Sequence, residues 1–278
     1  MSYATRFAPS PTGRLHKGHA FSALTAFEAA RRAGGRFVLR IEDIDFTRCR
    51  PQFEAAILED LAWLGIVWDG PVLRQSEHIA DYLVALDQLG SRGLVYRSFH
   101  TRREVLEAMA SAPHGAPEGY RGAPLPPREE AARLAAGAPF AWRLDLAAAI
   151  DAAGPLSFVE AGEGVAGEQG DITVDARAAG DVVLARKDVG VAYHLAVVVD
   201  DARQAITEVV RGQDLFEATH IQRLLQSLLG LPAPNYRHHR LILGPDGKRL
   251  AKRDRAETLQ ALRARGVTAD NIRKELGF

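Results

Sequence analysis

The sequence has a single cysteine, no apolar run long enough to cross a bilayer, and no excess of charge of either sign. One cysteine, Cys49, excludes an intramolecular disulfide and favours a protein of the reducing cytoplasm. The N-terminus has no apolar segment typical of a signal peptide, so we expect a cytoplasmic protein without a membrane anchor. The 35 basic residues equal the 35 acidic ones, which argues against a protein that coats nucleic acid nonspecifically.

One segment near the N-terminus has the residues of a phosphate-binding turn. Residues 6–19 read Arg-Phe-Ala-Pro-Ser-Pro-Thr-Gly-Arg-Leu-His-Lys-Gly-His and join a short apolar stretch to a long helical pattern. A strand-to-helix turn directs backbone N–H groups and the positive end of the helix at an anion. Gly13 and Gly18 permit close backbone contact. His16 and His19 are three residues apart and share one face of a first helical turn, where they suit hydrogen bonds to a phosphoryl group.

A second segment, far downstream, is strongly basic. Residues 247–254 read Gly-Lys-Arg-Leu-Ala-Lys-Arg-Asp and place four cations around a glycine-bearing turn: Lys248, Arg249, Lys252 and Arg253. A run of charge is usually a solvated face. This run can also bind a leaving pyrophosphate, and its pairing with the first segment favours that interpretation.

The two segments resemble the HIGH and KMSKS signatures of class I aminoacyl-tRNA synthetases. Longer strings resemble the glutamyl branch of that family: Arg-Phe-Ala-Pro-Ser-Pro-Thr-Gly at 6–13, Leu-Arg-Ile-Glu-Asp-Ile-Asp at 39–45, and Val-Arg-Gly-Gln-Asp-Leu at 210–215. The resemblance covers nearly the whole chain, and the motifs follow one another in the family's order and spacing.

The resemblance implies an ATP-dependent ligase that uses ATP with Mg²⁺. It assigns His16, His19 and Lys252 to catalysis. Arg249 stands where the family has the first lysine of its second motif, and Ala251 stands where it has a serine. The residues expected to bind ATP are Pro9, Thr12, Gly13, His16, Gly18, His19, Arg249 and Lys252.

The amino acid expected at the site is L-glutamate. Its carboxylates need cations, and guanidinium groups engage carboxylates through two hydrogen bonds. Its ammonium group needs an anion, for which Glu42 at the carboxyl end of a predicted parallel strand is the best candidate. From the residues and the resemblance together, the glutamate-binding set is Arg6, Phe7, Ala8, Pro9, Ser10, Glu42, Tyr193 and Arg211.

Strand, helix and strand follow within the first forty or so residues, which predicts a parallel, doubly wound (Rossmann-like) α/β fold. The predicted elements are strands at 3–9 and 37–41, and helices at 17–33, 51–65, 77–92 and 217–230, with a helical piece over 255–276. Strands 156–159 and 171–174 are expected in a small mixed subdomain, with the parallel sheet resuming at 181–184 and 191–199. We predict a catalytic domain over 1–95 and 181–245, an inserted subdomain resembling an acceptor-binding domain over 96–180, and a second-motif loop with a terminal helical piece over 246–278.

The chain ends soon after its second motif, where ordinary glutamyl-tRNA synthetases continue into a helical anticodon-binding region. It therefore resembles the shortened branch of the family, which has no such domain. That branch forms glutamyl-adenylate without tRNA and transfers glutamate to queuosine in the anticodon loop of tRNA(Asp). No coiled-coil pattern requires a dimer, so we expect a monomer.

Two other interpretations stay open. The chain can be a truncated conventional enzyme that charges the 3′ end of a tRNA, or a non-catalytic synthetase-like module that binds RNA or a protein partner. Intact His16, His19 and Lys252 argue against the second of these.

Family members often hold zinc in the insertion through three cysteines and a tyrosine. Here Ser98, His100 and Pro124 stand at the positions that align with the cysteines. Zinc usually takes four ligands in a tetrahedral arrangement, and a site built from His100, His114 and Tyr120 is the alternative that stays open. Because the cysteines are missing, we predict no structural zinc and expect packing to stabilise the insertion.

Overall fold

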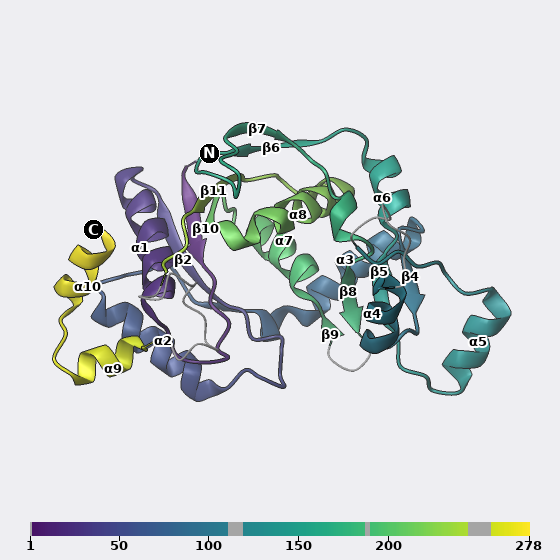
Figure 1. Cartoon of the computed structure of the whole chain (residues 1–278), viewed down its shortest axis with the longest axis horizontal. Helices are drawn as coiled ribbons and strands as arrows, with labels where there is room; N and C mark the ends of the chain where they lie inside the picture. Colours follow the sequence, from purple (N-terminus) through teal and green to yellow (C-terminus); the bar gives the residue numbers. More distant parts are fainter. Residues whose placement is uncertain (1, 111–118, 187–189, 244–256) are drawn as a thin grey trace.

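A computed structural model describes residues 2–110, 119–186, 190–243 and 257–278 (Figure 1). Parallel strands form its centre. Strand β1 pairs with β2 and β2 with β3, and β10 pairs with β11, all in parallel. The backbone N–H of Thr207, next to β10, donates to the carbonyl of Ala4 in β1 at 2.9 Å, which places β10 beside β1. The strands are β1 (Ala4–Phe7), β2 (Arg36–Ile41), β3 (Leu73–Arg74), β10 (Glu208–Gly212) and β11 (Asn235–His239).

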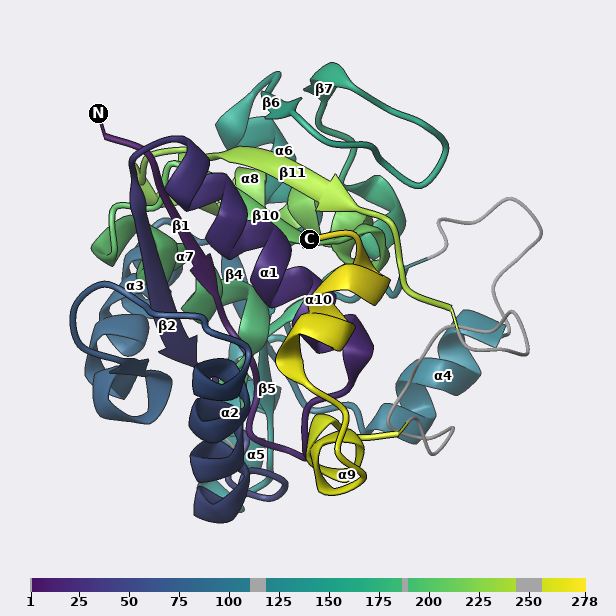
Figure 2. The same cartoon turned by 90° about the vertical axis from the view of Figure 1, so that its left-hand side faces the viewer.

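Helices cover both faces of this sheet, as Figure 2 shows. Phe37, Leu39 and Val210 pack on the side of α1 (Lys17–Arg32) and α2 (Pro51–Trp63). Val38 and Val209 face the opposite way, toward α8 (Phe216–Leu229). This alternation follows from the two-residue period of a strand and produces the doubly wound α/β fold that the sequence predicts.

A core of helices lies behind that second face. Buried apolar side chains from four helices and from the antiparallel sheet described in the next paragraph form one cluster there. These helices are α3 (Ile79–Ser91), α6 (Leu146–Ala153), α7 (Tyr193–Arg203) and α8. Three short 3₁₀ turns adjoin the helices: η1 (Gln75–His78), η2 (Arg177–Ala179) and η3 (Gln213–Leu215). Helix α8 ends where Gly230 adopts a left-handed conformation with φ 66°, a geometry that favours glycine.

A separate antiparallel sheet lies at the end of the molecule away from both termini (Figure 1). Its strands are β4 (Val95–Ser98), β5 (Ala141–Leu144), β8 (Val183–Arg186) and β9 (Gly190–Val191). Helices α4 (Arg102–Ala110) and α5 (Pro127–Ala135) accompany it.

The chain ends in two short helices, the first of which packs on α2 and the second on α1, the helix of the first motif. These are α9 (Leu259–Ala264) and α10 (Ala269–Leu276), and Ile272 and Leu276 of α10 are buried in the same cluster as Leu24 of α1. Lys17 Nζ lies 2.5 Å from Glu275 Oε1. In the described parts of the chain, none of the helices combines the length and the apolar character needed to span a bilayer.

Two predictions about the middle of the chain were wrong. The parallel sheet does not resume at 181–184 or 191–199, because Val183–Arg186 is β8 of the antiparallel sheet and Tyr193–Arg203 is helix α7. Leu195–Val198 are all buried, and a short buried apolar run has the same appearance in a helix and in a strand. The other predicted helices and strands are confirmed within a few residues, including the terminal helical piece.

The strands expected at 156–159 and 171–174 exist as β6 (Ser157–Glu160) and β7 (Gly170–Thr173). They do not form a separate small sheet, since β6 pairs in parallel with β11 through Tyr236 and Glu160. Strands from the two sides of the predicted boundary at residue 180 pair with each other, β6 with β11 and β5 with β8. The division into domains stays a prediction.

Candidate active site

The two histidines of the first motif fix each other at the start of α1. His16 is the N-cap residue, and its Nδ1 accepts a hydrogen bond from the backbone N–H of Gly18 at 3.1 Å. The Nδ1 of His19 accepts from the backbone N–H of His16 at 3.2 Å, and the two ring centroids are 3.8 Å apart. Because both Nδ1 atoms accept, both neutral rings carry their proton on Nε2. The capping geometry thus turns each imidazole into an Nε2–H donor.

Gly18 leaves space for the His16 ring. A Cβ atom at position 18 would lie 3.0 Å from Cε1 and 3.1 Å from Nδ1 of that ring. Such a contact is tighter than nine in ten real Cβ contacts, so a side chain at position 18 would push the His16 ring by a few tenths of an ångström.

The loop before α1 is tied to the carboxyl end of β2. The backbone N–H of Glu42 donates to the carbonyl of Pro9 at 3.1 Å, which brings the predicted Glu42 and the 8–13 loop together. Phe7 and Pro9 are buried, whereas Ser10 is exposed. The remaining predicted members of this loop are half-buried: Ala8, Thr12 and Gly13.

The cations of the second motif, Lys248, Arg249, Lys252 and Arg253, lie outside the described residues. The chain on either side of them contacts the first motif. Upstream, the Arg240 guanidinium lies 4.9 Å from the ring centroid of Phe21 in α1. Downstream, Thr258 forms a bridge with His16, and the backbone N–H of Leu259 donates to the carbonyl of Leu15 at 2.9 Å.

Arg6 and Glu42 belong to a buried network of charges. Arg6 Nε lies 2.9 Å and Arg40 Nη1 2.8 Å from the same oxygen of Asp201. Arg40 also lies 3.4 Å from Glu42 and 3.9 Å from Asp200. Three carboxylates face two guanidinium groups, so the network carries one net negative charge when all its members are ionised. Glu42, at 10% exposure, is its most accessible carboxylate.

Burial and these neighbours shift the carboxyl groups differently. Burial raises the pKa of Glu42 from its ordinary 4.5 to about 6, and Arg40 and Arg6 oppose that rise. Burial acts on Asp201 in the same direction, but its two arginine partners outweigh it and hold its pKa below the usual value. Asp201 is therefore the carboxylate of the network that its partners hold ionised, whereas burial raises the pKa of Asp200 as it raises that of Glu42.

Arg211 lies one strand away, on β10, and only 5% of it is exposed. Its Nε donates to His238 Nε2 at 3.1 Å, Nη1 to Gln222 Oε1 and Nη2 to Thr219 Oγ1, both at 2.7 Å. The hydroxyl oxygen of Tyr193 lies 3.4 Å from Nη1. Within the described residues no carboxylate lies within 4.0 Å of this guanidinium. A buried cation with neutral partners favours an anionic ligand.

The site contains residues that we did not predict. His194, next to Tyr193, is half-buried, and the desolvation of its ring together with the charge of Arg211 lowers its pKa to about 4. Arg40 is a charged residue within an apolar strand of the 39–45 string, and this pattern could have identified it as a residue of the site. Glu160 and His238 are 78 residues apart and have no comparable local signal.

The positions expected to align with zinc ligands show no metal-binding arrangement. Ser98 is buried, and the rings of His100 and Tyr120 are 6.3 Å apart. His114 lies outside the described residues. Where the structure describes the chain, no group of three His, Cys, Asp or Glu side chains is placed to hold a metal. The absence of structural zinc stays a prediction.

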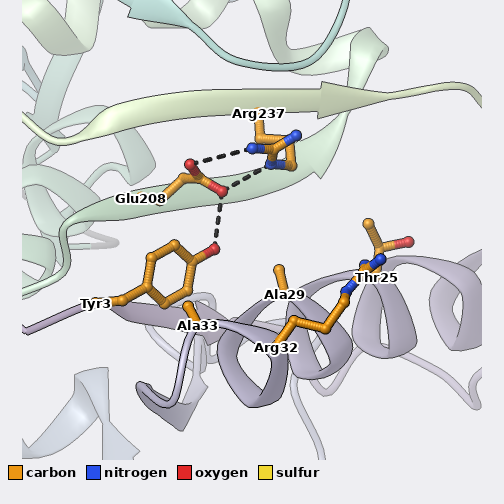
Figure 3. A pocket seen from close by; sticks show the side chains of 7 residues that line it. All are labelled: Tyr3, Thr25, Ala29, Arg32, Ala33, Glu208 and Arg237. Atoms are coloured by element: carbon orange, nitrogen blue, oxygen red, sulfur yellow. Dashed lines mark hydrogen bonds and ion pairs between the residues drawn. The ribbon is translucent and has the colours of Figure 1, made fainter.

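A cavity of about 520 Å³ lies at the amino ends of β1 and β10, away from the motif loops. Figure 3 shows Glu208 directed toward Tyr3 and Arg237, with α1 forming the opposite wall. Glu208 accepts hydrogen bonds from both side chains, at 2.8 Å from the Tyr3 hydroxyl and 2.7 Å from Arg237 Nε. Its position separates it from the candidate site.

Comparison with known proteins agrees with this geometry. The family model described as the catalytic domain of class I tRNA synthetases (E and Q) matches residues 2–274. The Glutamyl-Q tRNA(Asp) synthetase of Rhodobacter capsulatus is 50% identical, with 99% of each chain covered. The protein of that name from Symbiobacterium thermophilum is 42% identical over 98% of this chain and 85% of its own. A solved glutamate tRNA ligase from Elizabethkingia meningosepticum superposes with a TM-score of 0.75 at 31% identity, covering 91% of this chain and 52% of the ligase.

Proposed function

Because the chain belongs to the class I tRNA synthetases for glutamate and glutamine, and is thus an ATP-dependent ligase, we propose that it activates L-glutamate and transfers it to queuosine in tRNA(Asp). The observation that carries the glutamate assignment is the buried Arg211, whose partners among the described residues are all neutral, close to a network with net negative charge. The queuosine assignment rests on the relatives described above, whose names state this activity. We place the reaction in the cytoplasm, where tRNA and ATP are found.

In the first step, an oxygen of the glutamate α-carboxylate attacks the α-phosphorus of ATP, and pyrophosphate leaves. The nucleophile is already ionised, so the site needs no strong general base. It needs positioning and stabilisation of charge on the transferring group. The Nε2–H groups of His16 and His19, at the N-terminus of α1, are suited to that task. Mg²⁺ enters with the ATP phosphates as part of the substrate.

Glutamate is recognised by charges of both signs. Arg211 binds one carboxylate, with the Tyr193 hydroxyl beside it, and Glu42 binds the ammonium group. Arg6 is largely compensated by Asp201, so we infer that it supports the network more than it binds substrate. Lys252 and Arg249 are proposed to bind the phosphates, as the family resemblance implies.

In the second step, a hydroxyl group of the queuosine cyclopentenediol attacks the carbonyl carbon of glutamyl-adenylate. AMP leaves, and the hydroxyl proton passes to solvent or to the phosphate. Formation of the adenylate does not require tRNA in this proposal.

The experiment that tests the proposed function follows radiolabelled glutamate, with ATP and Mg²⁺, onto purified tRNAs. We expect label on tRNA(Asp) that contains queuosine, and none on tRNA(Asp) without it or on tRNA(Glu). Removing the 3′-terminal adenosine from the queuosine-containing tRNA should leave labelling intact, because the acceptor is in the anticodon loop.

Other results would overturn the proposal in distinct ways. Label on tRNA(Glu) that disappears with the 3′-terminal adenosine would identify a conventional charging enzyme. No label on any tRNA, combined with no binding of ATP, would identify a non-catalytic module.

A further inference from the structure

A carboxylate with a fully buried side chain is hydrogen-bonded to a histidine that contacts Arg211 of the candidate site. Glu160 ends β6, His238 lies in β11, and neither side chain has any exposed surface. Glu160 Oε2 lies 2.5 Å from His238 Nδ1. Glu160 Oε1 accepts hydrogen bonds from the backbone N–H groups of His238 and Gly162, both at 2.8 Å. Three donors therefore fix this carboxylate.

The other ring nitrogen of His238 faces Arg211. Its Nε2 accepts from Arg211 Nε at 3.1 Å, and it can do so only if Nε2 carries no proton. The proton of the neutral ring is then on Nδ1, where it donates to Glu160. Burial, with a further contribution from Arg211, lowers the pKa of His238 although Glu160 opposes the shift, which agrees with a neutral ring. Arg211 thus donates to His238, and His238 donates to Glu160, so both hydrogen bonds run in the same direction.

The surroundings leave this arrangement little freedom. A Cβ atom on Gly162 would lie 2.2 Å from the backbone oxygen of His238 and 3.0 Å from Glu160 Oε1. The Phe216 ring packs edge-on against His238 with centroids 5.2 Å apart. Because Glu160 and His238 are tightly packed on both sides, we expect them to hold a fixed geometry and not to exchange protons with solvent.

We propose that Glu160, acting through His238, is a positioning residue that orients the Arg211 guanidinium for the carboxylate of glutamate. It holds Nε of Arg211 in place without a direct ion pair, so the charge of Arg211 stays available to the ligand. This inference rests on the proposed function, in which Arg211 binds glutamate.

The substitution Glu160→Gln tests the direction of the hydrogen bonds. The amide oxygen takes the place that accepts from the two backbone N–H groups, and the amide NH₂ then faces His238 Nδ1. His238 has to accept there and carry its proton on Nε2, where it opposes the Nε–H of Arg211. In glutamate-dependent ATP–pyrophosphate exchange we expect the KM for glutamate to rise at least about tenfold, as for the loss of a hydrogen bond to a charged group. The KM for ATP should stay within about twofold, because the ATP-binding residues do not change.

Glu208→Gln is the matched control. Glu208 is also a buried carboxylate of this sheet with an arginine on β11 as its partner, but it faces the remote cavity of Figure 3. Both KM values should be unchanged in this variant. An equal rise of the glutamate KM in both variants would reduce Glu160 to a structural role and overturn the proposal.

A double-variant cycle with Arg211→Ala separates this inference from the proposed function. If Glu160 acts through Arg211, the variant carrying both substitutions should bind glutamate no more weakly than Arg211→Ala alone. Additive effects would contradict the relay. If Arg211→Ala alone leaves the KM for glutamate unchanged, the proposed site itself is wrong; if it raises the KM and Glu160→Gln does not, only the relay is wrong.

One measurement needs no variant to fold. Nitrogen-15 NMR of the histidine side chains should show His238 neutral at pH 7.5 with its proton on Nδ1, the opposite of His16 and His19. A proton on Nε2 of His238, in either the neutral or the charged ring, would overturn the proposal.

Discussion

Replacing Asp201 with asparagine removes the central charge of the buried network with almost no change in volume. The Asp201 carboxylate accepts hydrogen bonds from Arg6 Nε at 2.9 Å and from Arg40 Nη1 at 2.8 Å, and 6% of its side chain is exposed. In the variant, the two guanidinium groups face only Glu42 and Asp200. The asparagine oxygen can still accept hydrogen bonds, but its NH₂ group opposes the remaining arginine donor.

The expected cost follows from burial. Removing one partner of a buried ion pair typically lowers the free energy of unfolding by about 3–5 kcal/mol. Because one oxygen still accepts in Asp201→Asn, we expect the lower end of that range, about 3 kcal/mol. Whole domains are typically stable by about 5–15 kcal/mol, so the variant should fold at 25 °C with a clearly lower urea midpoint.

Urea unfolding followed by tryptophan fluorescence and circular dichroism measures this difference. Asp81→Asn is the matched control, because Asp81 also pairs with an arginine, Arg203, but 47% of its side chain is exposed. An exposed pair contributes at most about 1 kcal/mol. A loss below about 1 kcal/mol in Asp201→Asn, or an equal loss in the control, would refute the argument that burial makes the network strong.

Two further predictions concern the substrate sites. Gly18→Ala should lower kcat of ATP–pyrophosphate exchange at least about tenfold, because the new methyl group pushes the His16 ring and a transition-state donor contributes about 2.7–4 kcal/mol. Thermal stability should change little, since the higher helix propensity of alanine offsets the weakened His16 cap. An unchanged kcat would contradict the role of His16. The KM for glutamate should rise as the pH falls through about 6, where Glu42 takes up a proton and loses its attraction for the ammonium group. Glu42→Gln should abolish this rise, and a rise that persists in the variant would assign it to another group. Since the folded pKa of Glu42 lies above its ordinary 4.5, its ionisation opposes folding, and its contribution to the free energy of unfolding falls as the pH rises from 4.5 through about 6.

The sequence predicted the elements whose signals are local. Residues 6–19 contain the strand end, the N-cap and the helix start within one segment, so the placement of His16 at the beginning of α1 followed directly. The run Val191–Val199 was misassigned because α7 is buried on several sides and lacks a polar face that would reveal the helical period.

Interactions between distant segments could not be read from the sequence in the same way. Arg6 and Arg211 were both predicted as cations of the site, but only the packing of α7 beside β1 and β2 shows that Asp201 compensates Arg6. The pairing of β6 with β11 brings Glu160 to His238, and no local pattern at either residue indicates the other.

The central claim is that this site selects glutamate and activates it with ATP through Arg211. ATP–pyrophosphate exchange in the absence of tRNA, measured with glutamate, glutamine and aspartate in turn, tests it most directly. We predict exchange with glutamate alone, and a fall of at least about 30-fold in kcat/KM for glutamate in Arg211→Ala, as for the loss of a buried charged hydrogen bond. Equal exchange with glutamine, no exchange with any of the three, or an Arg211→Ala variant with wild-type kcat/KM would contradict the account.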